Sequence, residues 1–299
     1  MGMTWGVVRV HSIPDKADGE RMKKGIHDVP FLGFWNAETF FAEACLAGFD
    51  GVELNVLEDG GYLGLAGSDG DRKRVKRISL DCGVPIHSLS TNLHNRYPLS
   101  SGAAAIRKRG EEIGMKLIEI AAEIGASIVQ IVPGVIARET LYEEAYGFAQ
   151  ESLSTLGKAA REANVILGVE NICNHFLPSP KEFRRFLEEI DEPHIQAYLD
   201  IGNAMATGYA EHWIPSIGGR IVNIHAKDYR ISSREFVSPL SGDVRWPRIM
   251  EALRKVRYDG FLITTPPGYA YCSERLMKAC SNDLSAILDL HSIETTAGR

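Results

Sequence analysis

The chain has 299 residues, 44% of them hydrophobic, a formal net charge of −6 and an isoelectric point near 5.9. This acidity excludes the broad basic face that nucleic-acid binding requires, so we expect no nucleic-acid partner. Five scattered cysteines without a C-x-x-C pair exclude a disulfide framework and favour a reducing, cytoplasmic setting.

No apolar run approaches the roughly 20 residues that span a bilayer. The N-terminal residues also lack the charged and apolar regions of a secretory signal. We therefore expect no membrane association.

The first predicted strand covers residues 5–10, which are short and rich in valine. Residues 11–35 form a long polar and aromatic stretch, interpreted as a lid excursion over a pocket or as a surface loop with its own apolar cluster. Strands and helices then alternate to the end of the chain, where the last few residues are expected to fray. The further predicted strands are 51–56, 84–90, 127–132, 165–170, 195–200, 221–225 and 261–265.

The predicted helices lie between these strands. Glycines at 48, 83 and 125 mark helix ends, and Ser179 followed by Pro180 marks a helix start. Strict alternation predicts a parallel sheet with crossover helices. Eight units predict a single (β/α)8 barrel, a TIM barrel, covering residues 1–299 as one domain. An open doubly wound sheet is disfavoured, because no G-x-G-x-x-G follows the first strand.

Three consecutive predicted strands end in Glu170, Asp200 and His225. Active sites of such barrels form at the carboxyl ends of the strands, so these side chains should meet in one mouth. Oxygen and imidazole ligands suit Mn²⁺, Mg²⁺, Co²⁺ or Zn²⁺. The next strand ends in Thr264 and Thr265, which offer no carboxylate.

Several motifs occur in order through the second half of the chain. They are GVEN at 168–171, LDIGN at 199–203, NIHAKD at 223–228, SGDVRW at 241–246 and YDGFL at 258–262, with GVEL at 51–54 in the first half. Together they resemble the xylose-isomerase-like TIM-barrel family of sugar and sugar-phosphate isomerases and epimerases. Residues 177–191 are most similar to its L-ribulose-5-phosphate 3-epimerase and hexulose-6-phosphate isomerase branch.

The resemblance implies a divalent metal held by Glu170, Asp200, His225 and a glutamate at the end of the eighth strand. Thr265 stands where that fourth ligand is expected, with Thr264 as the alternative alignment. In the family the metal chelates a ketose and stabilises an enediolate. Two carboxylates exchange the proton on opposite faces. Here Glu170 is the expected catalytic carboxylate.

The resulting prediction is a metal-dependent isomerase or epimerase acting on a sugar or sugar phosphate. Thr265 leaves open an impaired activity. One alternative is a dehydratase of the same fold on a cyclic polyol or keto acid, which needs only one carboxylate base. Another is a non-catalytic sugar-binding barrel. A homo-oligomer is compatible with all three.

Secondary candidates for substrate binding are His87, Asn203, Lys227 and Arg230. Each also has a plain structural interpretation: a core histidine, a helix cap and two solvent-facing charges. For Glu53, a buried hydrogen-bonding role is favoured over catalysis.

Overall fold

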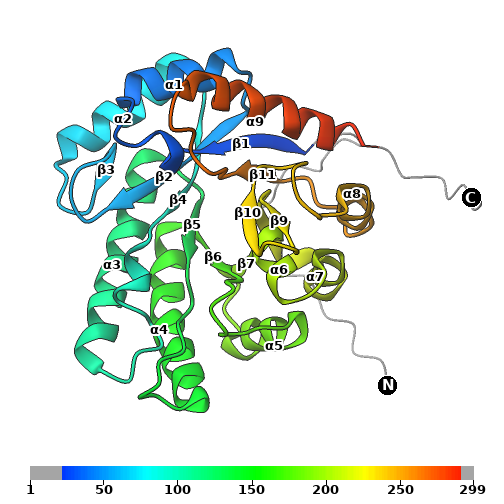
Figure 1. Cartoon of the computed structure of the whole chain (residues 1–299). Coiled ribbons are helices and arrows are strands. Elements are labelled where there is room, and N and C mark those ends of the chain that lie inside the picture. Colours follow the sequence, from blue (N-terminus) through cyan, green and yellow to red (C-terminus); the bar gives the residue numbers. More distant parts are fainter. Residues whose placement is uncertain (1–21, 291–299) are drawn as a thin grey trace, which may run out of the picture.

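The computed structural model describes residues 22–290 (Figure 1). In that range eight parallel strands close into a barrel in the order β1, β2, β4, β5, β6, β7, β8 and β11, and β11 pairs with β1 to complete the ring. Helices pack around the outside, as the ribbon shows. This confirms the predicted (β/α)8 barrel.

The barrel strands match the predicted ones closely from the second onward. Their bounds are β1 Lys23–His27, β2 Gly51–Leu57, β4 Ile86–Ser90, β5 Ile128–Ile131, β6 Ile166–Glu170, β7 Ile195–Asp200, β8 Ile221–His225 and β11 Phe261–Thr264. Three short strands lie outside the ring: β3 Leu63–Gly64 beside β2, and the antiparallel pair β9 Asp228–Arg230 and β10 Glu235–Val237.

The helices follow the strands in the expected alternation. Their bounds are α1 Ala37–Leu46, α2 Asp69–Cys82, α3 Ala104–Ile124, α4 Tyr142–Ala163, α5 Pro180–Ile190, α6 Ile201–Thr207, α7 Ala210–Ile217, α8 Trp246–Lys255 and α9 Ser273–Leu288, with 3-10 turns η1 Val29–Phe31, η2 Leu93–Asn95 and η3 Gly218–Arg220. None of the described helices is both long enough and apolar enough to cross a membrane.

Local signals set the helix ends where the sequence places them. The Ser179 side chain accepts a hydrogen bond from the Glu182 N–H at the start of α5, and Pro180 is the first helical residue. Gly83 and Gly125 end α2 and α3 in the left-handed conformation, which glycine adopts without a steric penalty.

The first barrel strand is not where the sequence analysis places it. The predicted strand at 5–10 lies outside the described residues. Part of the stretch interpreted as a lid, Lys23–His27, is instead barrel strand β1, paired with β11 and β2. Only the residues after it, with η1 and Trp35, form a loop between β1 and α1, and residues 11–21 are outside the described range.

Glycines make room where the strands approach each other inside the barrel. A Cβ atom at Gly25 would lie 2.9 Å from Ile263 Cγ1, and one at Gly51 would lie 2.9 Å from the Phe261 ring. Bulky side chains of β11 therefore fill space that β1 and β2 leave open. Above this packed layer, the carboxyl ends of the strands converge on one face of the barrel.

Candidate metal centre

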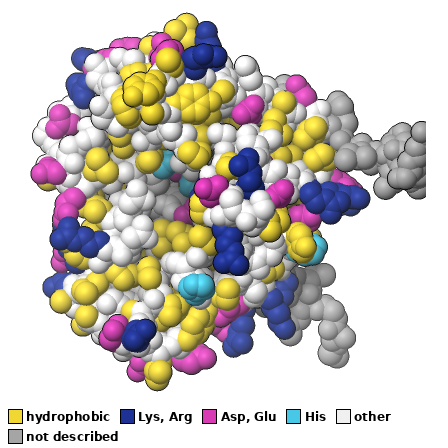
Figure 2. All heavy atoms as spheres, viewed as in Figure 1, with side chains coloured by type: hydrophobic (Ala, Val, Ile, Leu, Met, Phe, Trp, Pro, Cys, Tyr) yellow, Lys and Arg dark blue, Asp and Glu magenta, His cyan; other side chains and the backbone are white. Residues whose placement is uncertain are grey.

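Glu170, Asp200 and His225 are the last residues of β6, β7 and β8, which are neighbours in the barrel. All three are buried, and each offers one ligand atom within 4.8 Å of the others. The face drawn in Figure 2 is hollowed, and histidine and carboxylate side chains are visible inside the hollow. The three residues that the sequence analysis grouped are thus brought together.

His225 lies between two carboxylates. Its Nδ1 is 2.9 Å from Glu170 Oε1, and its Nε2 is 2.8 Å from Glu53 Oε1. Glu53 is fully buried in β2, and its other oxygen accepts hydrogen bonds from Ser88 Oγ and Tyr198 OH, each at 2.5 Å. Glu53 therefore fixes the ring of His225 through Nε2 and leaves Nδ1 facing the cluster.

Glu170 and Asp200 are oriented by their own neighbours. Gln130 Nε2 donates to Glu170 Oε2 at 2.6 Å. Asp200 is the N-cap of α6, and its Oδ1 accepts the Asn203 N–H at 2.7 Å. On the other oxygen, Lys227 Nζ lies 2.8 Å from Asp200 Oδ2.

The charges of the cluster shift one another. Burial alone would lower the pKa of His225, but the carboxylates of Glu53, Asp200 and Glu170 raise it well above its ordinary value. Burial raises the pKa of Glu170 despite the nearby imidazole. Burial would also raise the pKa of Asp200, yet Lys227 and His225 together lower it.

The donor set fits a divalent cation. Two carboxylates and one imidazole face a common point, which is the mixture that Mn²⁺, Co²⁺ and Zn²⁺ accept. In the described part of the chain, the buried Asp200 Oδ2 faces Lys227 Nζ at 2.8 Å and His225 Nδ1 at 3.7 Å, with no further hydrogen-bond donor. Such an oxygen has a lone pair left for a cation, so Glu170, Asp200 and His225 are the residues that would hold the metal.

The carboxyl end of β11 carries the two threonines. Thr265 Oγ1 lies 3.3 Å from His27 Nδ1, and His27 stacks near His225 with ring centroids 6.0 Å apart. Because successive side chains of a strand point to opposite faces, Thr265 faces the mouth. Thr264, which is fully buried, faces the helices. Of the two alignments, Thr265 is therefore the residue on the inner face.

His27, like Gln130, is a residue beside the cluster that sequence reasoning missed. It ends β1, is only 7% exposed, and its Nε2 is 2.8 Å from Ser90 Oγ. A histidine at the end of a β-branched run would have been a signal. Lys23–His27 offers two lysines and a glycine instead, and a better strand candidate precedes it.

The secondary candidates have unequal positions. His87 lies near the start of β4 and stacks on Phe261, the first residue of β11, so it is at the amino end of the barrel, away from the cluster. The side chain of Asn203 donates to the Asn171 carbonyl at 2.9 Å. Arg230 is exposed on β9 and donates to the Ser241 carbonyl. Among these four, Lys227 contacts Asp200 through its side chain, and Asn203 does so through its backbone N–H.

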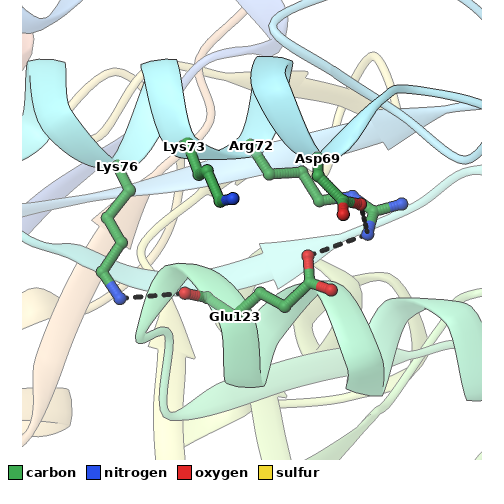
Figure 3. A pocket seen from close by; sticks show the side chains of 5 residues that line it. All are labelled: Asp69, Arg72, Lys73, Lys76 and Glu123. Atoms are coloured by element: carbon green, nitrogen blue, oxygen red, sulfur yellow. Dashed lines mark hydrogen bonds and ion pairs between the residues drawn. The ribbon is translucent and has the colours of Figure 1, made fainter.

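A separate depression of 200 Å³ lies on the outer surface between α2 and α3 (Figure 3). Arg72 is buried there against Glu123 at 2.8 Å, and Lys76 donates to the Glu123 carbonyl. Two of the basic side chains of α2, Arg72 and Lys76, are thus paired with α3.

Curated relatives are 27% to 29% identical in sequence to this chain. The L-ribulose-5-phosphate 3-epimerase UlaE of Escherichia coli O157:H7 is 29% identical over 219 residues, which are 71% of this chain and 76% of that protein. UlaE of Salmonella paratyphi A is 27% identical over 219 residues, again 71% of this chain and 76% of the relative. The similarity spans most of both chains.

Solved structures share the fold. An L-ribulose 3-epimerase superposes with a TM-score of 0.77 at 19% identity, covering 89% of this chain and 94% of the other. The D-psicose 3-epimerase of Clostridium cellulolyticum H10, solved with D-tagatose, superposes with a TM-score of 0.75 at 16% identity. The match covers 90% of this chain and 99% of the other. The model of the xylose isomerase-like TIM barrel family matches residues 41–278. The chain belongs to this family of xylose isomerase-like TIM barrels, which includes sugar epimerases and isomerases.

Proposed function

We propose that this protein is a divalent-metal-dependent isomerase or epimerase of a ketose or ketose phosphate, with Glu170 as the group that moves the proton. The observation that carries the proposal is the convergence of Glu170, Asp200 and His225 at the ends of three neighbouring strands. The names of the curated relatives support the substrate class.

A bound divalent cation would supply Lewis acidity that makes a carbon-bound proton next to a carbonyl group easier to remove. The remaining chemistry belongs to the protein. Burial holds the pKa of the Glu170 carboxyl above its ordinary value, which makes its carboxylate a stronger base. Gln130 holds one Glu170 oxygen, so the other side of the carboxylate is presented in a fixed orientation.

Thr265 favours a second candidate, a dehydratase of the same fold. Its neutral hydroxyl faces the mouth beside His27, where a second carboxylate would stand in a two-base epimerase. Loss of water next to a carbonyl group requires one base to remove the proton, which Glu170 alone can supply.

The test combines metal binding with turnover. We expect Mn²⁺ or Co²⁺ to bind the wild-type protein in calorimetry, and a panel of ketoses and ketose phosphates in deuterated water to exchange a carbon-bound proton. Glu170→Gln should lower exchange by at least a thousandfold, because the amide cannot act as the base. Asp59→Asn, an exposed change in the loop after β2, is the matched control.

Three outcomes separate the possibilities. Exchange with interconversion of ketoses supports the isomerase or epimerase. Loss of water from a cyclic polyol or keto acid, without interconversion, would replace it with the dehydratase. Failure of every divalent ion to bind would contradict both metal-dependent functions.

A further inference from the structure

Lys227 is built into the candidate metal centre. Its side chain is only 17% exposed, and its ammonium lies 2.8 Å from Asp200 Oδ2. Among the described residues, the next charged group that faces this oxygen is His225, whose Nδ1 lies 3.7 Å away. The ammonium and a divalent cation would therefore face the same carboxylate.

Two further elements hold the ammonium in this position. The Phe236 ring, on β10, lies 4.4 Å from Lys227 Nζ, a distance suited to a cation–π contact. The stem passes close to α6, where a Cβ atom at Gly202 would lie 3.1 Å from Lys227 Cγ. A side chain fixed by contacts on three sides differs from a mobile surface lysine.

The strand pair that carries Phe236 is itself anchored. Asp228, fully buried at the start of β9, accepts hydrogen bonds from the Tyr229 and Val244 N–H groups and from Trp246 Nε1. Tyr229 packs on Phe236 with ring centroids 5.3 Å apart. The covering ring over Lys227 is thus tied to the start of α8.

The local charges indicate what the ammonium of Lys227 does in the site. Asp200 is completely buried, and an isolated carboxylate there would carry a large desolvation cost. The ammonium offsets that cost. The ammonium would also repel a divalent cation held by Asp200, and this repulsion would be strong in a site shielded from water.

We propose that Lys227 is the resident counter-ion of Asp200, which stabilises the site before metal binds and reduces its affinity for divalent cations. The inference rests on the metal centre of the proposed function. With Thr265 adding no negative charge, Lys227 makes this a site of moderate affinity from which the metal exchanges readily. Lys227 is thus a positioning residue that tunes metal binding.

The experiment compares Lys227→Met with Lys227→Arg in chelator-treated protein. Mn²⁺ is titrated by calorimetry, and thermal unfolding is recorded with and without Mn²⁺. We expect the Met variant to bind Mn²⁺ at least tenfold more tightly and to unfold at a lower temperature than wild type when metal-free. The Arg variant keeps the charge and should stay within about threefold of wild type.

Two more variants keep the test decisive. Arg234→Met removes an exposed charge from the loop between β9 and β10 and should leave the Mn²⁺ affinity unchanged. Phe236→Leu loosens the ammonium without deleting it and should tighten Mn²⁺ binding two- to fivefold, which provides a readout if Lys227→Met does not fold.

Results that contradict this inference can be told apart from results that contradict the proposed function. Unchanged or weaker Mn²⁺ binding in both Lys227→Met and Phe236→Leu, with wild type binding normally, would overturn this inference and leave the proposed function intact. Absence of divalent-ion binding in wild type and all variants would overturn both.

Discussion

Thr265 is the residue at which this barrel departs from a two-carboxylate proton-transfer site. Its hydroxyl faces the mouth and contacts His27 Nδ1 at 3.3 Å, whereas Thr264 is buried on the opposite side of the strand. Position 265 is therefore the place in this strand end where a charged side chain would interact with a cation in the mouth. A substitution there tests the assignment directly.

Replacing Thr265 with glutamate should strengthen metal binding. A carboxylate added beside Glu170, Asp200 and His225 attracts a divalent cation, so we expect Thr265→Glu to lower the Mn²⁺ dissociation constant by about tenfold or more. Thr265→Gln has nearly the same shape without the charge and should show no gain. Calorimetry on both variants provides the measurement, and equal affinities for the two would mean that position 265 does not reach the cation.

How far the site could be predicted differs from residue to residue. Glu170, Asp200 and His225 could be predicted because each ends a strongly apolar run, and the ends of neighbouring parallel strands must meet. His27 could not be predicted, because its strand lacks such a run. The contact between Lys227 and Asp200 depends on how the chain turns after β8, which no local pattern specifies.

The same distinction holds for the elements. Strands with β-branched residues on a regular repeat were placed correctly, and so were helix ends marked by Ser179, Gly83 and Gly125. Strand β1 was missed because Lys23–His27 has little intrinsic strand preference. Its pairing with β2 and β11 on either side makes it a strand, and context of this kind overrides propensity.

Gly25 lies where β1 packs closely against β11 and β2. An added Cβ would meet Ile263 Cγ1 at 2.9 Å and the Gly51 carbonyl at 3.3 Å, so the packed interior has no room for it. We expect Gly25→Ala to lower the free energy of unfolding by about 1–3 kcal/mol. Urea unfolding followed by circular dichroism provides the measurement.

The matched control is a glycine with open space around it. A Cβ atom at Gly147, inside α4, would have open space around it, with no described atom beyond its chain neighbours and the nearby backbone of α4 within 4 Å. Gly147→Ala should therefore stabilise the protein by up to about 1 kcal/mol through helix propensity. If both substitutions shifted stability in the same direction, close packing at Gly25 would not be the cause.

At the scale of the whole molecule, the barrel also buries titratable groups that are not part of the candidate metal centre. His94, in η2, is fully buried, and its Nε2 is 3.1 Å from the Gly110 carbonyl of α3. Burial lowers the pKa of His94 from 6.5 to about 4. The folded protein therefore keeps this ring neutral at pH values where the unfolded chain would protonate it.

This difference couples stability to pH. Between pH 6.5 and about 4 the unfolded state binds the additional proton, so the stabilisation is complete above pH 6.5 and is lost as the pH falls toward 4. One such histidine should cost roughly 2 kcal/mol by pH 5. His94→Gln keeps a donor for the Gly110 carbonyl but cannot protonate. Urea unfolding at pH 7.5 and pH 5 should show wild type losing roughly 2 kcal/mol more than the variant, whereas parallel losses would assign the acid sensitivity to other groups.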